Sequence, residues 1–345
     1  VNLYGSFMEG TLNWTAKGGH FLLITPTSWK NGSHFELLRK ELLREAKLRR
    51  VVSFTRRDVV FEDVLQEVEF TKWKKKGVVQ KNSKIEVGVA RKISKVKPET
   101  EFSLGYSKLI PDIGKGIILT TAHERHLEMI ESVNGGLPCT LDELGLNIRI
   151  GEVVMFREDE GAVRQGDKRS GDIPLIREHH INPWGLEHPE KGGIEEWISR
   201  KSPRVKTIGE FVAISRRGAK GDRRRLTACY VPDELHCGIE NKVVYLRNED
   251  SGKESLMKGV SAFLNTMFAE IQIRTIVGGT MVNKSDLVRL RIPSKKLLTS
   301  VGEGMQPDNP EDSRRLQELF SEQLGLSNSD TEEWIEHLTR WRGNR

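Results

Sequence analysis

Apolar residues in the first 75 positions alternate between helical spacing and short strand-like runs. A helical pattern ends at Gly18 and Gly19, and the apolar run Phe21–Ile24 that follows is typical of a strand buried in a parallel sheet. A second helical pattern leads to strand-like segments at Leu48–Phe54 and Val64–Trp73. Helix and strand units of this length predict an α/β fold, in which ligands bind beyond the carboxyl ends of strands.

The pattern changes after residue 75. Residues 76–115 are rich in Lys, Gly, Ser and Pro and are predicted to form a linker or crossing segment between two domains. Residues 116–300 mix short strands with helices, which indicates an α+β domain. Its clearest segments are the strands Ile148–Phe156, Phe211–Arg216, Leu226–Val231 and Val243–Leu246 and the helix Lys258–Ile273. Residues 301–345 are predicted to form an acidic helical tail.

Composition narrows the class of protein. The chain has 345 residues, of which 37% are apolar and 30% charged, so it is globular rather than disordered. Its apolar runs are far shorter than the roughly 20 residues that span a bilayer, and no signal-peptide pattern follows Val1. Three cysteines cannot pair completely, which fits a reducing compartment. These features predict a cytoplasmic protein that does not bind membranes.

The net charge of +6 is unevenly distributed. Lys72–Lys97 contains ten basic residues and one acidic residue, and Ile214–Leu226 contains six basic residues and one acidic residue. Gly302–Arg345 is the reverse, with ten acidic and five basic residues. A single basic run is usually a solvated face, but two separated runs indicate a polyanionic partner. We therefore expect the chain to bind nucleic acid.

Two segments place polar or aromatic residues beside strand ends. In Gly18–Trp29, two glycines end a helix, an apolar strand follows, and Pro26 turns the chain at the carboxyl end of that strand. In Phe54–Gln66, Phe61 lies on a loop ahead of the last predicted strand. Either segment alone fits an ordinary strand end, so their order along the chain is the more informative feature.

The succession of these segments resembles the second half of the catalytic domain of N6-adenine DNA methyltransferases from type II restriction-modification systems. The matching residues are Val1–Glu9, Gly18–Gly19, Ile24–Trp29 and Val60–Gln66. Later segments resemble the target-recognition domain of that family, namely Arg223–Leu226, Glu240–Lys242, Ala262–Thr266 and Gly278–Leu287. The resemblance implies the carboxyl-terminal half of a doubly wound, Rossmann-like methyltransferase sheet in residues 1–75, followed by an α+β target-recognition domain that binds double-stranded DNA.

Two motifs of that family do not occur in this sequence. The family binds S-adenosylmethionine with a Gly-containing turn and holds the target adenine with an Asn/Asp-Pro-Pro-Tyr/Phe turn, and both precede the position that matches Val1. Asn182–Trp184 is the nearest imitation of the second, but it has one proline and lies in the recognition half. We therefore expect a fragment, without a complete catalytic set, of an S-adenosylmethionine-dependent enzyme whose cofactor site lies mostly upstream.

The resemblance assigns roles to residues of both segments. The wall of the active site would be formed by Pro26, Thr27, Ser28 and Trp29. Phe61 would stack on the adenine that such an enzyme flips out of the duplex, which recovers part of the lost base stacking. On the sequence alone, the alternative is that Phe61 packs in the core between Val60 and Val64.

The best candidate for a DNA contact is the basic loop at 215–225, because arginine can bind both phosphates and guanine edges. The candidate residues are Arg216, Arg217, Lys220, Arg223, Arg224 and Arg225, together with Thr280, Asn283 and Lys284 on a second, glycine-containing turn. A solvated hairpin is the alternative for the first loop. For the second, the alternative is a structural turn in which Asn283 caps a helix from Ser285.

Two other functions remain open, a DNA-binding specificity module without catalysis and a component of a restriction nuclease. Asp233 and Glu240 followed by Lys242 would be the nuclease residues, but only six residues separate the two carboxylates. No pattern predicts a metal, because His123–His126 lacks the i, i+4 histidine pair of a zinc protease and the segment Cys229–Cys237 lacks a second ligand pair. Besides DNA, a cognate restriction endonuclease is the partner that this family suggests.

Overall fold

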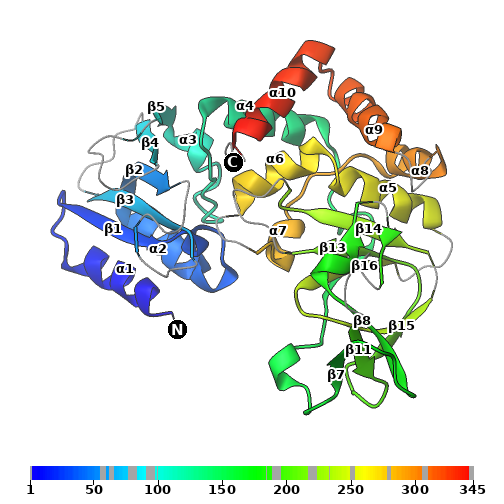
Figure 1. Cartoon of the computed structure of the whole chain (residues 1–345). Coiled ribbons are helices and arrows are strands. Elements are labelled where there is room, and N and C mark those ends of the chain that lie inside the picture. Colours follow the sequence, from blue (N-terminus) through cyan, green and yellow to red (C-terminus); the bar gives the residue numbers. More distant parts are fainter. Residues whose placement is uncertain are drawn as a thin grey trace.

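The computed structural model of the chain (Figure 1) describes residues 2–54, 60–61, 66–76, 84–90, 98, 100–183, 185–188, 196–216, 224–232, 234–248, 253–277, 281–304 and 310–341. Within these residues, one mixed sheet with its helices lies beside a larger part that contains further sheets and most of the helices. This mixed α/β architecture agrees with the predicted fold class. None of the described helices is long and apolar enough to cross a membrane.

The first sheet contains the three strands predicted near the amino end, with the last of them inserted between the other two. Its order is β1-β3-β2-β4-β5, and β3 runs antiparallel to both β1 and β2. The bounds are β1 His20–Pro26, β2 Ala46–Phe54, β3 Val68–Lys75, β4 Lys84–Ala90 and β5 Thr100–Gly105. β1 and β2 therefore end at the same edge, where Pro26 pairs with Val68 and Ser53 pairs with Glu69. β1 is the outermost strand on its side of the sheet.

Helices α1 (Leu3–Trp14) and α2 (Glu36–Glu45) cover one face of this sheet (Figure 1). Met8 and Leu12 of α1 and Leu42 of α2 are fully buried in one apolar cluster with Trp73 of β3. Burying a side chain of this size stabilises the fold by about 1.5–3 kcal/mol. Gly18 has a φ of +77° between α1 and β1, so the predicted break at the glycine pair is a left-handed turn.

The segment predicted as a linker, residues 76–115, differs from that expectation. It contributes β4, β5 and the short helix α3 (Tyr106–Leu109), and β4 extends the first sheet by pairing parallel with β2. Ile85 and Val87 are buried on one face of β4, while Glu86 points to the other face, 3.8 Å from Arg50. The strand alternation was hidden by the surrounding lysines and glycines.

The second part is built on a four-stranded antiparallel sheet in the order β14-β13-β16-β6. The bounds are β6 Leu146–Ile150, β13 Phe211–Ser215, β14 Thr227–Val231 and β16 Val243–Asn248. Three of the four predicted strands match closely, but Ile148–Phe156 ends early. The chain leaves the sheet at Gly151, where an added Cβ would lie 2.2 Å from the carbonyl oxygen of Glu240.

A five-stranded sheet of short strands projects below the four-stranded one (Figure 1), in the order β12-β15-β8-β11-β7, and is called the small-sheet module. The two-stranded pair β9–β10 lies close to β14. The bounds are β7 Val163–Gln165, β8 Asp172–Ile176, β9 Ile181–Asn182, β10 Gly185–Leu186, β11 Glu196–Ser199, β12 Lys206–Ile208 and β15 Leu235–Ile239. Its own apolar cluster includes Ile173, Leu175 and Ile198. This small-sheet module was not predicted from the sequence, because its strands have two to five residues.

The helix predicted at Lys258–Ile273 is two helices, α5 (Glu254–Leu264) and α6 (Met267–Ile276). Asn265 lies at the break. Its Nδ2 donates to the carbonyl oxygens of Ala228, Ser261 and Pro183, and its Oδ1 accepts from the backbone N–H of Ala228. The break therefore fixes the helices to β14 with a single amide side chain.

The remaining helices pack around α5 and α6. They are α4 (Glu124–Gly136), α7 (Lys284–Leu287), α8 (Lys295–Gly304), α9 (Pro310–Gln323) and α10 (Asn328–Trp341). Phe320 of α9 and Trp334 of α10 are buried against Phe268 of α6, so the acidic carboxyl end is part of the folded body. Helix α8 continues past residue 300, where the tail was expected to begin, and packs closely on α5.

Candidate functional site

The carboxyl ends of β1 and β2 and the start of β3 form the edge at which the sequence placed an active-site wall. Directly after β1, the backbone N–H of Thr27 donates to the carbonyl oxygen of Glu67 over 2.9 Å. This bond joins the wall to the end of the loop that carries Phe61. The two segments that carry the family resemblance are thus neighbours in space.

The four predicted wall residues differ in exposure. Pro26 is followed by a 3-10 turn, Thr27–Lys30, which contains the other three. Thr27 and Trp29 are buried, whereas Pro26 and Ser28 are half-buried. The Ser28 hydroxyl lies 2.9 Å from that of Tyr4, and the Trp29 ring packs against Trp73. Pro26 and Ser28 are therefore partly accessible to solvent at the edge of the sheet, whereas Trp29 packs in the core beneath the turn.

A buried cation holds this wall to the rest of the chain. The Arg39 guanidinium, from α2, donates to the carbonyl oxygens of Trp29 (2.7 Å), Gly32 (2.6 Å) and Gly116 (2.8 Å). Burial lowers the pKa of Arg39 to about 10, so the side chain remains charged at neutral pH. Beside it, Lys30 and Glu69 form a buried ion pair at 2.6 Å.

Several buried polar atoms at this edge have no hydrogen-bond partner among the described residues. They are Thr25 Oγ1, Trp29 Nε1 and both amide atoms of Asn31. Buried polar groups without partners are costly, at about 1–3 kcal/mol each.

Phe61 is 48% exposed, so it is not a core residue. The neighbouring Val60 packs instead against the small apolar cluster that contains Phe54 and Val68. The remainder of the loop, including Val64, lies outside the described residues. An aromatic ring that is half exposed can stack on a planar partner.

Arg216 is a correction to the predicted set of DNA contacts. It is only 9% exposed, and its guanidinium donates to the carbonyl oxygens of Val282 (2.9 Å) and Asn241 (2.7 Å) and to Asn283 Oδ1 (2.9 Å). Burial lowers its pKa. Arg216 therefore anchors the end of the basic loop to the second turn.

Arg225 is a second correction, because it is 1% exposed. Its Nη1 donates to the carbonyl oxygen of Val277 over 3.3 Å, and its backbone N–H donates to Glu270, which pairs with Arg274 at 2.5 Å. Burial lowers the pKa of Arg225, whereas the carboxylate of Glu67 opposes that shift. Both ends of the basic loop are thus fixed inside the protein, one of them near the Phe61 loop.

The other predicted contacts have different outcomes. Arg224 is half-buried and donates to the carbonyl oxygen of Asn265 over 3.0 Å. Asn283 caps α7, which begins at Lys284, and its backbone N–H donates to Asp286 over 2.8 Å. Lys284 is exposed and stays a predicted DNA contact, while residues 278–280 of that turn lie outside the described residues. Four candidates lie outside the described residues, namely Arg217, Lys220, Arg223 and Thr280.

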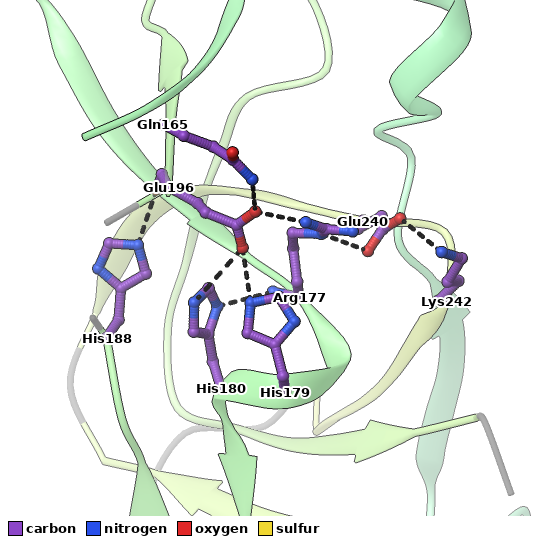
Figure 2. A network of polar contacts seen from close by, with 8 residues as sticks. All are labelled: Gln165, Arg177, His179, His180, His188, Glu196, Glu240 and Lys242. Carbon is purple, nitrogen blue, oxygen red and sulfur yellow. Dashed lines mark hydrogen bonds and ion pairs between the residues drawn. The ribbon is translucent and has the colours of Figure 1, made fainter. Parts of the chain in front are cut away.

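A polar network in the small-sheet module escaped the sequence analysis (Figure 2). Glu196, at the start of β11, accepts hydrogen bonds from Gln165 and Arg177, and its other oxygen lies 2.6 Å from His179 Nε2. Arg177 also donates to Glu240 over 2.9 Å, and Lys242 lies 3.4 Å from that carboxylate. The network ties the small sheet to the four-stranded sheet. The sequence analysis named Glu240 and Lys242 for other reasons, and the signal it missed is three histidines, at 179, 180 and 188, close to an arginine.

The network contains a trio that resembles a metal site. Ligand atoms of His179, His180 and Glu196 all lie within 4.8 Å of one another. However, Nδ1 of His180 accepts the backbone N–H of Arg177 over 3.0 Å, so Nε2 of the neutral ring carries its hydrogen and has no lone pair to offer. Burial lowers the pKa of His180 to about 4, which keeps that neutral form at pH 7. The donor set therefore does not fit a metal.

The residues of the nuclease and zinc alternatives are engaged in other ways. Glu240 is 1% exposed and is bound by Arg177 and Lys242, while Asp233 lies outside the described residues. Cys229 and Cys237 are buried free thiols, and burial raises the pKa of each to about 12. Neither pattern forms a metal-binding group in the described part of the chain.

Comparison with known proteins agrees with the sequence resemblance. No protein-family model matches the chain. It is 29% identical to the type II methyltransferase M.BsuBI of Bacillus subtilis over 314 residues, 88% of this chain, and 29% identical to the type II methyltransferase M.PstI of Providencia stuartii over 341 residues, 94% of this chain. The chain is a homologue of type II methyltransferases. It spans 61% and 65% of the lengths of these two relatives.

Among solved structures, the type IIL restriction-modification enzyme MmeI in complex with DNA is similar to this chain with a TM-score of 0.56. The match covers 99% of this chain and 52% of that protein, at 10% sequence identity. At this level of identity the similarity concerns the fold. The fold of this chain thus has a counterpart in a restriction-modification enzyme.

Proposed function

We propose that the chain is the carboxyl part of an S-adenosylmethionine-dependent DNA methyltransferase that modifies the N6 atom of adenine within a restriction-modification system. The observation that carries the proposal is the homology to type II methyltransferases over about nine-tenths of the chain. The exposure of Phe61, at 48%, supports the adenine-specific proposal, because an exposed aromatic ring is available to stack on a flipped base. The relatives are longer, so this activity belongs to a longer enzyme.

In this proposal the chain supplies one side of the reaction site. S-Adenosylmethionine would donate the methyl group, and the turns that bind it and hold the adenine amino group would come from outside residues 1–345. Pro26 and Ser28 would face the extruded base, and Phe61 would stack on it.

The chain alone should not methylate DNA. Incubating it with tritiated S-adenosylmethionine and duplex DNA should give no transfer above a denatured control, whereas a longer protein that also contains the two missing turns should transfer label to adenine N6. Transfer by the 345-residue chain would mean that the active site has been misplaced. Label on cytosine, rather than adenine, would overturn the adenine-specific part of the proposal.

A specificity module without catalysis is the second candidate, because the domain after residue 115 carries most of the fold and the basic loop. This candidate predicts that even a longer protein containing this chain does not methylate DNA, although the chain still binds DNA. The nuclease reading has less support, since Glu240 is occupied by Arg177 and Lys242. It requires metal-dependent cleavage that is lost in Glu240→Gln.

A further inference from the structure

The most exposed large hydrophobic side chain among the described residues is Phe156, at 83%. It lies in the 3-10 turn Met155–Arg157, between β6 and β7. In Figure 1 this turn stands at the margin of the small-sheet module, on the side where α1 and α2 lie. No role has been given to it so far.

The turn is held firmly on its amino side. The backbone N–H of Val153 donates to the carbonyl oxygen of Ile239, and the N–H of Asn241 donates back to Val153, each over 2.9 Å. Gly151 lets this segment approach the Glu240 backbone, since a Cβ there would lie 2.2 Å from the Glu240 carbonyl oxygen. The side chain of Glu240 is in turn held by the network of Figure 2.

The carboxyl side of the turn is anchored as well. Glu158, whose side chain is 3% exposed, accepts hydrogen bonds from Arg204 and Ser202, each over 3.0 Å. Phe156 therefore stands between two fixed points, and its exposure is imposed by the scaffold. Because the chain on both sides of Phe156 is already ordered, binding a partner costs less conformational entropy than ordering a mobile loop would.

The chemistry around Phe156 combines a flat apolar ring with cations. The Arg157 guanidinium lies 5.5 Å from the centre of the ring. The turn that carries Arg204 and Ser202 also carries the exposed Arg200 and Lys201. Glu158, Asp159 and Glu160 follow, so residues 155–160 carry a net charge of −2, and the cations of the neighbouring turn bring the sum to +1.

We propose that Phe156 contacts the bases of duplex DNA outside the target adenine, inserted at a base step with Arg157 against the adjoining backbone. The inference rests on the proposed function, which supplies the DNA. Aromatic and aliphatic side chains that wedge into base steps have this form, an apolar tip flanked by basic residues on a rigid support. Because the acids at 158–160 offset the cations Arg157, Arg200, Lys201 and Arg204 to within one charge, the ring contributes through stacking and its contribution does not depend on salt.

The test is a salt titration of DNA binding by the 345-residue chain and its variants. Phe156→Ala should raise the dissociation constant about 5- to 150-fold at every salt concentration, with an unchanged slope of log K against log salt. Arg157→Ala should reduce that slope by about 1. Phe156→Trp should restore binding, since the larger ring also stacks.

The matched control is Leu37→Ala on α2, which removes a side chain that is 81% exposed and should leave binding unchanged. All variants should keep the parent's unfolding midpoint, because the altered side chains are solvent-exposed. If the parent binds DNA and Phe156→Ala binds equally well, the inference is wrong while the proposed function stands. Dissociation of a dimer by Phe156→Ala, with DNA binding intact, would assign the ring to a second copy of the chain instead. No DNA binding by the parent would overturn both.

Discussion

The arginines at the two ends of the basic loop bind groups in the interior of the protein. Arg216 binds Val282, Asn241 and Asn283, and Arg225 binds Val277, so the loop ends and the second turn are joined from within. Charge alone does not distinguish such an anchor from a DNA contact. Burial distinguishes the two, because a cation that is 1% exposed has no surface to offer to a phosphate.

Arg225→Ala should therefore act on stability and Arg224→Ala on DNA binding. Removing a cation from a buried group that includes Glu67, Glu270 and Asp286 should lower the free energy of unfolding by about 3–5 kcal/mol. Arg224→Ala should cost less than about 1 kcal/mol but reduce the salt slope of DNA binding by about 1. Urea denaturation and a salt titration measure the two effects. A stable Arg225→Ala variant with a reduced salt slope would show that Arg225 faces DNA.

Phe61→Ala, made in a longer enzyme with both missing turns, should slow methylation about 5- to 150-fold through lost stacking. DNA affinity should barely change, because phosphate contacts come from the second domain. Fluorescence of 2-aminopurine at the target position reports base flipping and should fall. Since the side chain is 48% exposed, the unfolding temperature should stay the same. An unchanged flipping signal with a drop of several degrees would instead make Phe61 a structural residue.

At the scale of elements, helices α5 and α8 touch backbone to backbone. A Cβ on Gly302 would lie 1.8 Å from the carbonyl oxygen of Ser255, and one on Gly259 would lie 1.8 Å from that of Leu298. Two glycines on facing helices thus permit an approach that no other residue allows. Gly304, in the same turn of α8, has open space around it.

Gly302→Ala should consequently destabilise the protein by about 1–3 kcal/mol or more, because the helices must move apart. Gly304→Ala is the matched control and should be neutral or stabilising by up to about 1 kcal/mol, since alanine favours helix. Chemical denaturation of both variants measures the difference. Equal effects would mean that α8 adapts its position without cost.

Helix α4 gives the fold a dependence on pH through His126. Burial, together with the nearby charges of His123, His337 and Arg274, lowers the pKa of this 2% exposed ring to about 3. The unfolded chain binds the proton near pH 6.5 and the folded chain does not, so stability falls as pH drops below 6.5.

Between pH 7.5 and 5.5, His126 should therefore remove about 1.4 kcal/mol from the free energy of unfolding. The variant His126→Gln should lose correspondingly less over this interval, and His34→Gln, at an exposed position, should behave as the parent does. Urea denaturation at the two pH values gives the comparison. The same loss in His126→Gln as in the parent would show that His126 is protonated in the folded protein.

Elements with clear spacing were predictable, and elements defined by distant contacts were not. The apolar runs of β1, β2 and β3 predicted three strands of one sheet. The break between α5 and α6 depends on Asn265 reaching Pro183 and Ala228, which no local pattern reveals. In the same way, the order of motifs indicated the site at the edge of the first sheet, but the inward direction of Arg216 and Arg225 depends on residues at 241, 277 and 282.

At the scale of the whole molecule, the net charge of +6 predicts salt-sensitive attraction to DNA. Replacing Arg217, Lys220 and Arg223 by alanine should reduce the slope of log K against log salt by about 3, one phosphate for each side chain, without a change in stability. The control Lys295→Ala, Lys296→Ala removes two exposed cations of α8 and should have little effect. An unchanged slope in the triple variant would place the DNA on another surface.

The outermost position of β1 determines how the isolated chain behaves at high concentration. Among the strands that the structure describes, none lies on the outer side of β1, and Leu22 and Ile24 of this strand are 55% and 46% exposed. Leu3, Phe7 and Trp14 of the adjacent α1 are exposed as well. An open, apolar strand margin is a template for edge-to-edge pairing between copies. We therefore expect the isolated chain to aggregate by pairing of β1 strands from different copies. Low protein concentration and moderate salt should keep it monomeric.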